Sequence, residues 1–226
     1  MDCLVVVAHP DDEVLGAGAL MYQLSQEGSA VSVCVMDGSV QARSARPDDA
    51  ALDHDISSSM AALGVARVLR GDFPNIQMNT VPHLQMVQFI ESAIETVRPD
   101  IVVTHHPADT NNDHLQTSLA CQAAIRLFQR RTDVKPVKEF WYMEVPSATD
   151  WSVNQAMQPF TPNTFIEVGR GGVQRKIDAL SQYRGVMRPY PHPRSAEALM
   201  GLAAYRGGQA GMEYAEAFQC VFRRGI

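Results

Sequence analysis

Residues 2–18, "DCLVVVAHPDDEVLGAG", decide the fold of this chain. The apolar, β-branched run from Leu4 to Val7 is typical of a buried strand, and an amphipathic segment predicted to be a helix begins at Val14. Between them stand one histidine and three acidic residues: His9, Asp11, Asp12 and Glu13. Carboxylates crowded at the end of a buried strand repel one another unless a positive charge lies among them. The stretch therefore predicts a strand, a polar turn that holds a cation, and a helix.

Apolar and amphipathic segments alternate along the first two-thirds of the chain. Further strands are expected at residues 30–36, 66–70, 100–105 and 137–145. Helices are expected at residues 14–26, 50–63, 81–97, 113–130, 173–183 and 195–218, the last interrupted by "RGGQAG". This alternation predicts an α/β fold with a mainly parallel sheet covered on both faces, in a single domain of residues 1–226. Ligands bind such sheets at the carboxyl ends of the strands.

The composition argues against several classes of partner. The 226 residues carry a net charge of −6, which disfavours nucleic acid and anionic membrane surfaces. No stretch approaches the roughly 18 consecutive apolar residues of a membrane helix, and the N-terminus lacks the basic start of a signal peptide. The four cysteines are scattered without a C-x-x-C pair, which indicates free thiols and a cytoplasmic location.

A second polar cluster, "THHPADTNNDH" at residues 104–114, follows the strand expected at 100–105. Two such clusters at the carboxyl ends of parallel strands are expected to face one cleft. Imidazole and carboxylate ligands without thiolate suit a catalytic zinc ion. His9 and Asp12 would bind it from one turn, with a third ligand from His105, His106 or His114. Alternatively, the carboxylates only cap the following helix and His105 is a core histidine.

At these residues the sequence resembles the PIG-L/LmbE family of zinc-dependent de-N-acetylases. The motifs that carry the resemblance are "AHPDDE" at 8–13 and "HPADTNNDH" at 106–114, and further similar segments extend over nearly the whole chain. The resemblance implies a Rossmann-like three-layer α/β sandwich. It also implies one Zn²⁺ per chain, held by His9, Asp12 and His114, with Asp11 as general base.

The chain departs from the family pattern at two positions. Asn111 stands where many members have a histidine that stabilises charge or donates a proton. An amide cannot act as an acid, although Asn111 can still donate a hydrogen bond to the substrate. Asn75 stands where related sequences often carry an acidic residue.

Five other residues receive roles in the expected site. Proton delivery to the leaving amine falls to Asp11 or to His192. Arg43 and Arg194 are expected to contact the substrate. Asp109 and Glu13 are expected to orient the ligands, although Glu13 could instead only cap the helix.

The resemblance implies a hydrolase that removes the N-acetyl group from an amino sugar or its conjugate and releases acetate. A metal-dependent hydratase or lyase, and a metal-binding protein without activity, are the alternatives. A nucleotide-binding module is disfavoured because no G-x-G-x-x-G follows the first strand. The expected partner is a small acetylated sugar whose identity the sequence does not fix, and assembly as a homo-oligomer stays open.

Overall fold

The computed structural model describes residues 1–37, 48–153 and 157–225. Seven strands form one sheet in the order β3-β2-β1-β4-β5-β7-β6. They are β1 (Cys3–Val7), β2 (Val31–Asp37), β3 (Arg67–Phe73), β4 (Ile101–His105), β5 (Glu139–Met143), β6 (Thr164–Glu167) and β7 (Ala215–Arg223). The first five strands in this order are parallel, whereas β7 runs antiparallel to both β5 and β6. The mainly parallel sheet expected from the sequence is therefore confirmed.

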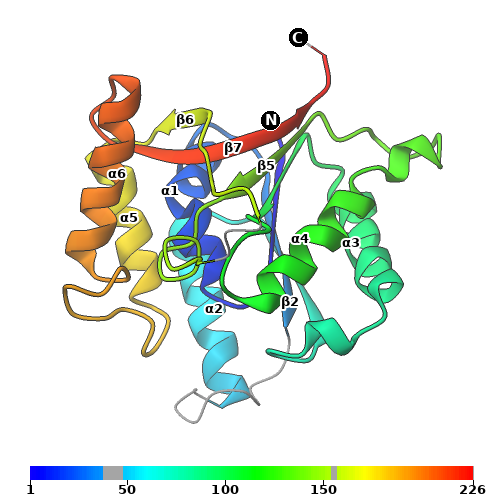
Figure 1. The fold of residues 1–226 in the computed structure, drawn as a ribbon, viewed down its shortest axis with the longest axis horizontal. Coiled ribbons are helices and arrows are strands. Elements are labelled where there is room, and N and C mark those ends of the chain that lie inside the picture. Colours follow the sequence, from blue (N-terminus) through cyan, green and yellow to red (C-terminus); the bar gives the residue numbers. More distant parts are fainter. Residues whose placement is uncertain (38–47, 154–156, 226) are drawn as a thin grey trace.

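Helices cover both faces of the sheet, which gives three layers (Figure 1). They are α1 (Asp12–Gln26), α2 (Asp49–Leu63), α3 (His83–Val97), α4 (Asn112–Ala124), α5 (Gly169–Leu180) and α6 (Ala196–Ala210), with short 3₁₀ turns at Met78–Thr80 and Leu127–Gln129. Helices α1, α2, α5 and α6 contribute to one core, and α3 and α4 to the other. Alternate side chains of β1 enter opposite cores, with Val5 in the first and Val6 in the second. Both faces of β1 are buried, which explains its continuous apolar sequence.

The C-terminal region differs from the helix expected at residues 195–218. Helix α6 ends at Ala210 because Gly211 adopts a left-handed conformation, with φ of 72°. Residues 215–223 then form β7, which lies between β5 and β6. The expectation was wrong here because helix-forming residue types occupy a strand that tertiary pairing holds in place.

Two further differences concern the end of α4 and the presence of β6. The helix expected to reach Arg130 ends at Ala124, and a 3₁₀ turn follows it. Strand β6 was not expected, because it is only four residues long and lies in a proline-containing region.

The order of the strands brings the two polar clusters together. Strands β1 and β4 are neighbours in parallel register, with Val6 opposite Thr104. The turn after β1 and the segment after β4 therefore emerge side by side at one edge of the sheet. Among the described residues, no helix is both long and apolar enough to cross a membrane.

Candidate metal centre

The turn after β1 places His9 and Asp12 against each other. The backbone N–H of His9 donates to Asp12 Oδ2 at 3.1 Å, and His9 Nδ1 lies 3.2 Å from the same oxygen. Asp11 stands between them with φ of 105°, a conformation that non-glycine residues rarely adopt. Helix α1 begins at Asp12, so the turn delivers one histidine and one carboxylate to the same point.

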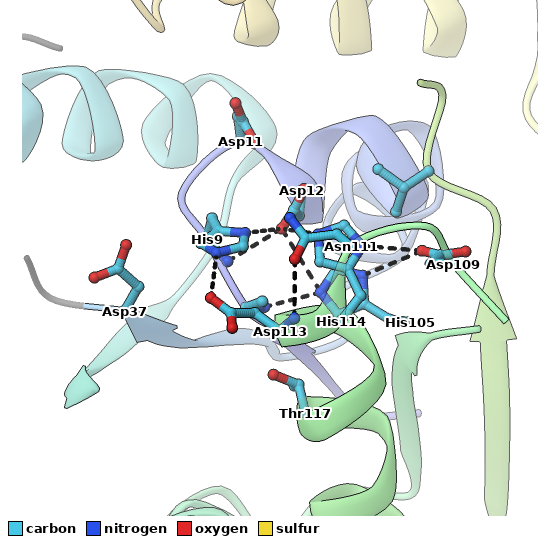
Figure 2. Close-up of polar contacts among 12 residues, drawn as sticks. His9, Asp11, Asp12, Asp37, His105, Asp109, Asn111, Asp113, His114 and Thr117 are labelled. Atoms are coloured by element: carbon cyan, nitrogen blue, oxygen red, sulfur yellow. Dashed lines mark hydrogen bonds and ion pairs between the residues drawn. The ribbon is translucent and has the colours of Figure 1, made fainter. Parts of the chain in front are cut away.

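His114, in the first turn of α4, completes a group of three with His9 and Asp12 (Figure 2). Its Nε2 lies 3.2 Å from Asp12 Oδ2. One potential ligand atom from each of the three residues lies within 4.8 Å of the others, and all three side chains are buried. Two imidazoles and one carboxylate are the donor set of a catalytic zinc site with a remaining open position.

Two further carboxylates contact the ring nitrogens of His9 and His114 that point away from Asp12, called here the outer nitrogens. His9 Nε2 donates to Asp113 Oδ2 at 3.0 Å, and His114 Nδ1 donates to Asp109 Oδ2 at 3.0 Å. The other nitrogen of each ring lies 3.2 Å from Asp12 Oδ2, so both nitrogens of each histidine face a carboxylate, which favours the doubly protonated ring. A metal ion among the three residues would replace the proton on the nitrogen that faces Asp12, while the proton facing Asp113 or Asp109 stays in place.

The carboxylates around His9, Asp12 and His114 favour positive charge at the centre of this group. Burial disfavours a charged His114, but the Asp12 and Asp109 carboxylates outweigh it and raise the pKa of His114 to about 10. The pKa of His9 is also raised, because hydrogen bonds to Asp113 and Asp12 oppose the effect of burial. The pKa of Asp12 is lowered against burial, chiefly by His114. Protons thus supply positive charge where a divalent cation would supply it, and the residues fit a metal ion.

His105 belongs to a second potential group, with Asp109 and His114. Its Nε2 accepts a hydrogen bond from the backbone N–H of Ala8 at 2.8 Å, so that lone pair is already used. Its Nδ1 lies 3.9 Å from Asp109 Oδ2, beyond hydrogen-bonding distance, and its ring stacks on His114 with centroids 3.8 Å apart. Burial and the neighbouring His114 lower the pKa of His105, which keeps the ring neutral. The geometry favours His105 as a core residue that joins the ends of β1 and β4.

His106 also has its own partners. Its Nδ1 accepts from the backbone N–H of Ala108 at 3.1 Å, and its ring packs edge-on against Tyr142 and Phe160. Of the three histidines considered from the sequence, His114 is the one whose nitrogen faces both His9 and Asp12.

A cavity of about 330 Å³ opens onto this group. Its lining residues are His9, Asp12, Thr110, Asn111, His114, Ser147, Ala148, Trp151, Arg188, His192 and Arg194. The metal-ligand candidates, His192, Arg194 and Asn111 are thus brought together, whereas Asp11, Glu13 and Asp109 lie behind the lining. Arg43 lies outside the described residues.

Asp11 does not face the three convergent side chains. Figure 2 shows its carboxylate turned away from them. Its Oδ2 accepts from Arg194 Nη1 at 3.3 Å, and Arg194 Nε donates to Ser147 Oγ at 2.7 Å. Arg194 therefore links Asp11 to the cavity wall.

Glu13 holds the backbone of Asp11 rather than a ligand side chain. Its Oε2 accepts from the Asp11 N–H at 3.1 Å, and its Oε1 accepts from the hydroxyl of Tyr183 at 2.5 Å. Complete burial raises the pKa of Glu13 to about 8 in spite of the hydrogen bond from Tyr183. This buried pair fixes the unusual conformation of Asp11.

The two asparagines that depart from the family pattern have different positions. Asn111 caps α4, with its Oδ1 accepting from the Asp113 N–H at 2.9 Å, and it also lines the cavity. Asn75 is buried and donates to Asp37, and it is not among the lining residues.

Several residues of the site were not expected from the sequence. Asp113 looked only like the start of a helix, yet it binds His9 and also accepts from the backbone N–H groups of Ile76 and Met78. Its place beside His114 in a polar run was the only available signal. Tyr183 lies 170 residues from Glu13 in the chain, and no local pattern could pair them.

The family model described as PIG-L, GlcNAc-PI de-N-acetylase, matches residues 4–125, more than half of the chain. The chain belongs to the PIG-L family. The resemblance seen in the sequence is thereby confirmed, and both polar clusters lie within the matched residues.

Two relatives of this PIG-L protein are named as deacetylases. The 1D-myo-inositol 2-acetamido-2-deoxy-alpha-D-glucopyranoside deacetylase of Mycolicibacterium gilvum is 28% identical over 151 residues, 54% of this chain and 53% of the relative. The chain thus matches about half the length of that protein. The uncharacterized deacetylase YaiS of Escherichia coli is 29% identical over 191 residues, 80% of this chain and 89% of the relative.

Solved structures with the same fold carry different activities. The conserved protein TT1542 of Thermus thermophilus has a TM-score of 0.82 at 22% identity, covering 100% of this chain and 97% of the other. GalB, the 4-carboxy-2-hydroxymuconate hydratase of Pseudomonas putida, has a TM-score of 0.78 at 22% identity, covering 100% and 98%. The N,N'-diacetylchitobiose deacetylase of Pyrococcus horikoshii has a TM-score of 0.76 at 17% identity, covering 97% and 83%. At these identities the likeness is one of fold.

Proposed function

We propose that this protein is a zinc-dependent hydrolase that removes the N-acetyl group from an amino sugar or sugar conjugate and releases acetate. The observation that carries the proposal is the group His9, Asp12 and His114, buried at one end of a cavity of about 330 Å³. Both histidines have their outer nitrogens held by carboxylates, which leaves one nitrogen of each for the metal. The deacetylase relatives support the reaction and the class of substrate.

In this proposal His9, Asp12 and His114 hold one Zn²⁺ per chain. The ion supplies Lewis-acid activation of water and of the acetyl carbonyl. The rest of the reaction falls to the protein: a carbon–oxygen bond forms at the acetyl carbon, the carbon–nitrogen bond breaks, and a proton reaches the leaving nitrogen.

Asp11 is the proposed general base. Its carboxylate takes the proton that the attacking water loses and returns it to the amine nitrogen. This role requires the side chain to rotate from its contact with Arg194 toward the cavity. His192 lines the cavity and is the alternative proposed donor to the amine, and Asn111 and Arg194, which also line it, are the proposed contacts for substrate hydroxyls.

Hydration of a double bond is the second candidate activity, because GalB shares the fold. A hydratase would use the same metal group but release no acetate. We also propose a cytoplasmic location, which the four free cysteines support.

The test is acetate release from methyl N-acetylglucosaminide by zinc-loaded protein. We expect turnover that a chelator abolishes and added Zn²⁺ restores. Asp11→Asn should lower kcat by about 10²–10⁴-fold and keep a zinc content near one per chain. Asp178→Asn, at an exposed position on α5, is the matched control and should behave like the wild type. Turnover that survives complete removal of metal would overturn the proposal.

A further inference from the structure

Part of the cavity wall is built by the loop between α5 and α6. This loop contributes Arg188, His192 and Arg194 to the lining. The loop folds back on itself, because the N–H of Arg188 donates to the carbonyl of Arg194 at 3.3 Å and the N–H of His192 donates to the carbonyl of Pro189 at 3.2 Å. Two guanidinium groups and an imidazole thus lie on one wall.

The two arginines of this wall are not equivalent. Arg194 is engaged with Asp11 and Ser147. Arg188 is exposed, and among the described residues its guanidinium has no ion pair and no side-chain hydrogen bond. By contrast, Arg184 on the same loop pairs with Asp55 at 3.3 Å. In a protein of net charge −6, the Arg188 guanidinium is a positive group in a cavity without a protein partner.

The remaining groups of the wall are donors as well. His192 Nδ1 accepts from the backbone N–H of Arg194 at 3.0 Å, so the neutral ring carries its proton on Nε2. Trp151 packs edge-on against this ring with centroids 5.4 Å apart, and half of its surface remains exposed. An exposed indole face beside these hydrogen-bond donors suits a sugar ring that carries an acceptor-rich substituent.

Neither of the nearby acidic side chains forms an ion pair with Arg188 among the described residues. Asp11 pairs with Arg194, and Asp150 lines a separate cavity beside Pro191 and Pro193, from which its charge acts on His192. The volume of about 330 Å³ is at the lower end for small-molecule sites, which favours a single sugar with a small substituent.

We infer that Arg188 recognises a negatively charged group, a phosphate or a carboxylate, attached to the amino sugar that the protein deacetylates. This inference rests on the proposed function, and it makes Arg188 a specificity-determining residue. Arginine suits the task because its planar fork binds either anion through two parallel hydrogen bonds. The acetamide, at the metal-binding group, and the anionic group, at Arg188, would occupy the same cavity.

The test compares three N-acetylglucosamine derivatives: the neutral methyl glycoside, the 1-phosphate and the glycoside of glycolic acid. For zinc-loaded wild type we expect kcat/KM for at least one anionic derivative to exceed that of the methyl glycoside by about tenfold, the effect of one hydrogen bond to a charged group. Arg188→Gln should lower kcat/KM for the preferred anionic derivative about tenfold more than for the methyl glycoside, and Arg188→Lys should restore part of the difference. The phosphate and carboxylate arms distinguish which anion is preferred.

A matched control and a binding measurement test anion recognition by Arg188 separately from the proposed hydrolysis. Arg175→Gln removes the same charge from α5, outside the cavity, and should leave the preference intact. Equal effects of Arg188→Gln on all three derivatives, or none, would overturn the inference. If the protein releases no acetate from any derivative, charge recognition can still be tested. Isothermal calorimetry then measures the affinity of zinc-loaded protein for the three corresponding free amines. Weaker binding of only the anionic amines to Arg188→Gln would then support charge recognition while the proposed hydrolysis fails.

Discussion

In the proposed metal site, single carboxylates orient the two histidines. Asp109 fixes the proton of His114 on Nδ1, and Asp113 fixes that of His9 on Nε2. Asp113 additionally accepts from two backbone N–H groups, so replacing it would disturb the surrounding loop. Asp109 makes its side-chain contacts within the histidine cluster and is therefore the better position for a test.

Asp109→Ala should weaken zinc binding by about 10–100-fold, because His114 loses the acceptor that orients its ring. Asp109→Asn keeps an acceptor oxygen and should lose less affinity. Competition with a chromogenic chelator measures the affinity, and circular dichroism checks the fold. Asp178→Ala is the exposed control. Equal zinc affinity in Asp109→Ala and wild type would remove His114 from the proposed ligand set.

At this scale the sequence predicted contacts between residues close in the chain, and the two polar motifs of the family predicted the approach of His114. The spacing of His9 and Asp12 predicted their meeting, and the structure shows both facing one point. Contacts such as Glu13 with Tyr183 depend on how α5 packs beside α1, which no local pattern encodes. The same holds for Arg188, whose position follows from the folding of a long loop.

At the scale of elements, the helical conformation of α1 is interrupted at Ala17, and a side chain of β7 accepts hydrogen bonds from the backbone beyond the interruption. Ala17 has non-helical angles of −142° and 19°, which frees backbone N–H groups in the middle of the helix. The Glu216 carboxylate of β7 accepts from the N–H groups of Ala19 at 3.1 Å and Leu20 at 2.7 Å. Lys176 of α5 donates to the same carboxylate at 2.7 Å. A buried glutamate thus caps the second half of α1.

The segment of α1 before the break carries the candidate ligand Asp12, and its packing admits little movement. A β-carbon on Gly16 would lie 2.3 Å from the sulfur of Met143 in β5, so only glycine allows this approach. Contacts with β5 and β7 therefore fix the helix on both sides of Ala17.

Glu216→Ala should lower the free energy of unfolding by about 3–5 kcal/mol, because it leaves the buried Lys176 ammonium without its partner. Urea unfolding followed by circular dichroism measures the change. Glu167→Ala, at an exposed position on β6, should cost far less. Adding Lys176→Met to Glu216→Ala should recover part of the loss. A cost of Glu216→Ala no larger than that of Glu167→Ala would show that the pair does not stabilise the fold.

The same strand shows why element prediction failed at the C-terminus. Residues 213–219, "EYAEAFQ", are mostly helix formers, and residues up to 218 were expected to be helical. In the structure Glu216 is buried because α1 and α5 supply its partners. Most of the parallel strands were predictable because their sequences are largely apolar, whereas β7 depends on contacts made by distant segments.

At the scale of the whole molecule, the sheet is held at the amino ends of its central strands by Asp100. Its Oδ2 accepts from the N–H of Asp2 at 3.0 Å, next to β1. Its Oδ1 lies 3.0 Å from the ammonium groups of Lys135 and Lys138, in the segment that leads into β5. One carboxylate at the start of β4 thus connects three neighbouring strands, at the edge of the sheet opposite the candidate metal centre.

This arrangement predicts a specific loss of stability in acid. Burial disfavours the charged form of Asp100, but hydrogen bonds from Lys135, Lys138 and the backbone outweigh it and lower its pKa to about 2. In the unfolded chain the pKa is about 3.9, so the folded protein binds this proton less readily. The stability that Asp100 contributes is therefore fully present above about pH 4 and is lost as the pH falls toward 2.

Asp100→Asn should be less stable than the wild type at pH 6, and the difference should shrink steadily between about pH 4 and pH 2. Unfolding free energies from urea titrations at a series of pH values measure it. Protonation of the histidines in the candidate metal centre affects both proteins equally, because Asp100 lies at the far edge of the sheet, and so cancels in the difference. A difference that is the same at pH 2 and pH 6 would mean that the substitution disturbs packing, and that the charge of Asp100 does not join the three strands.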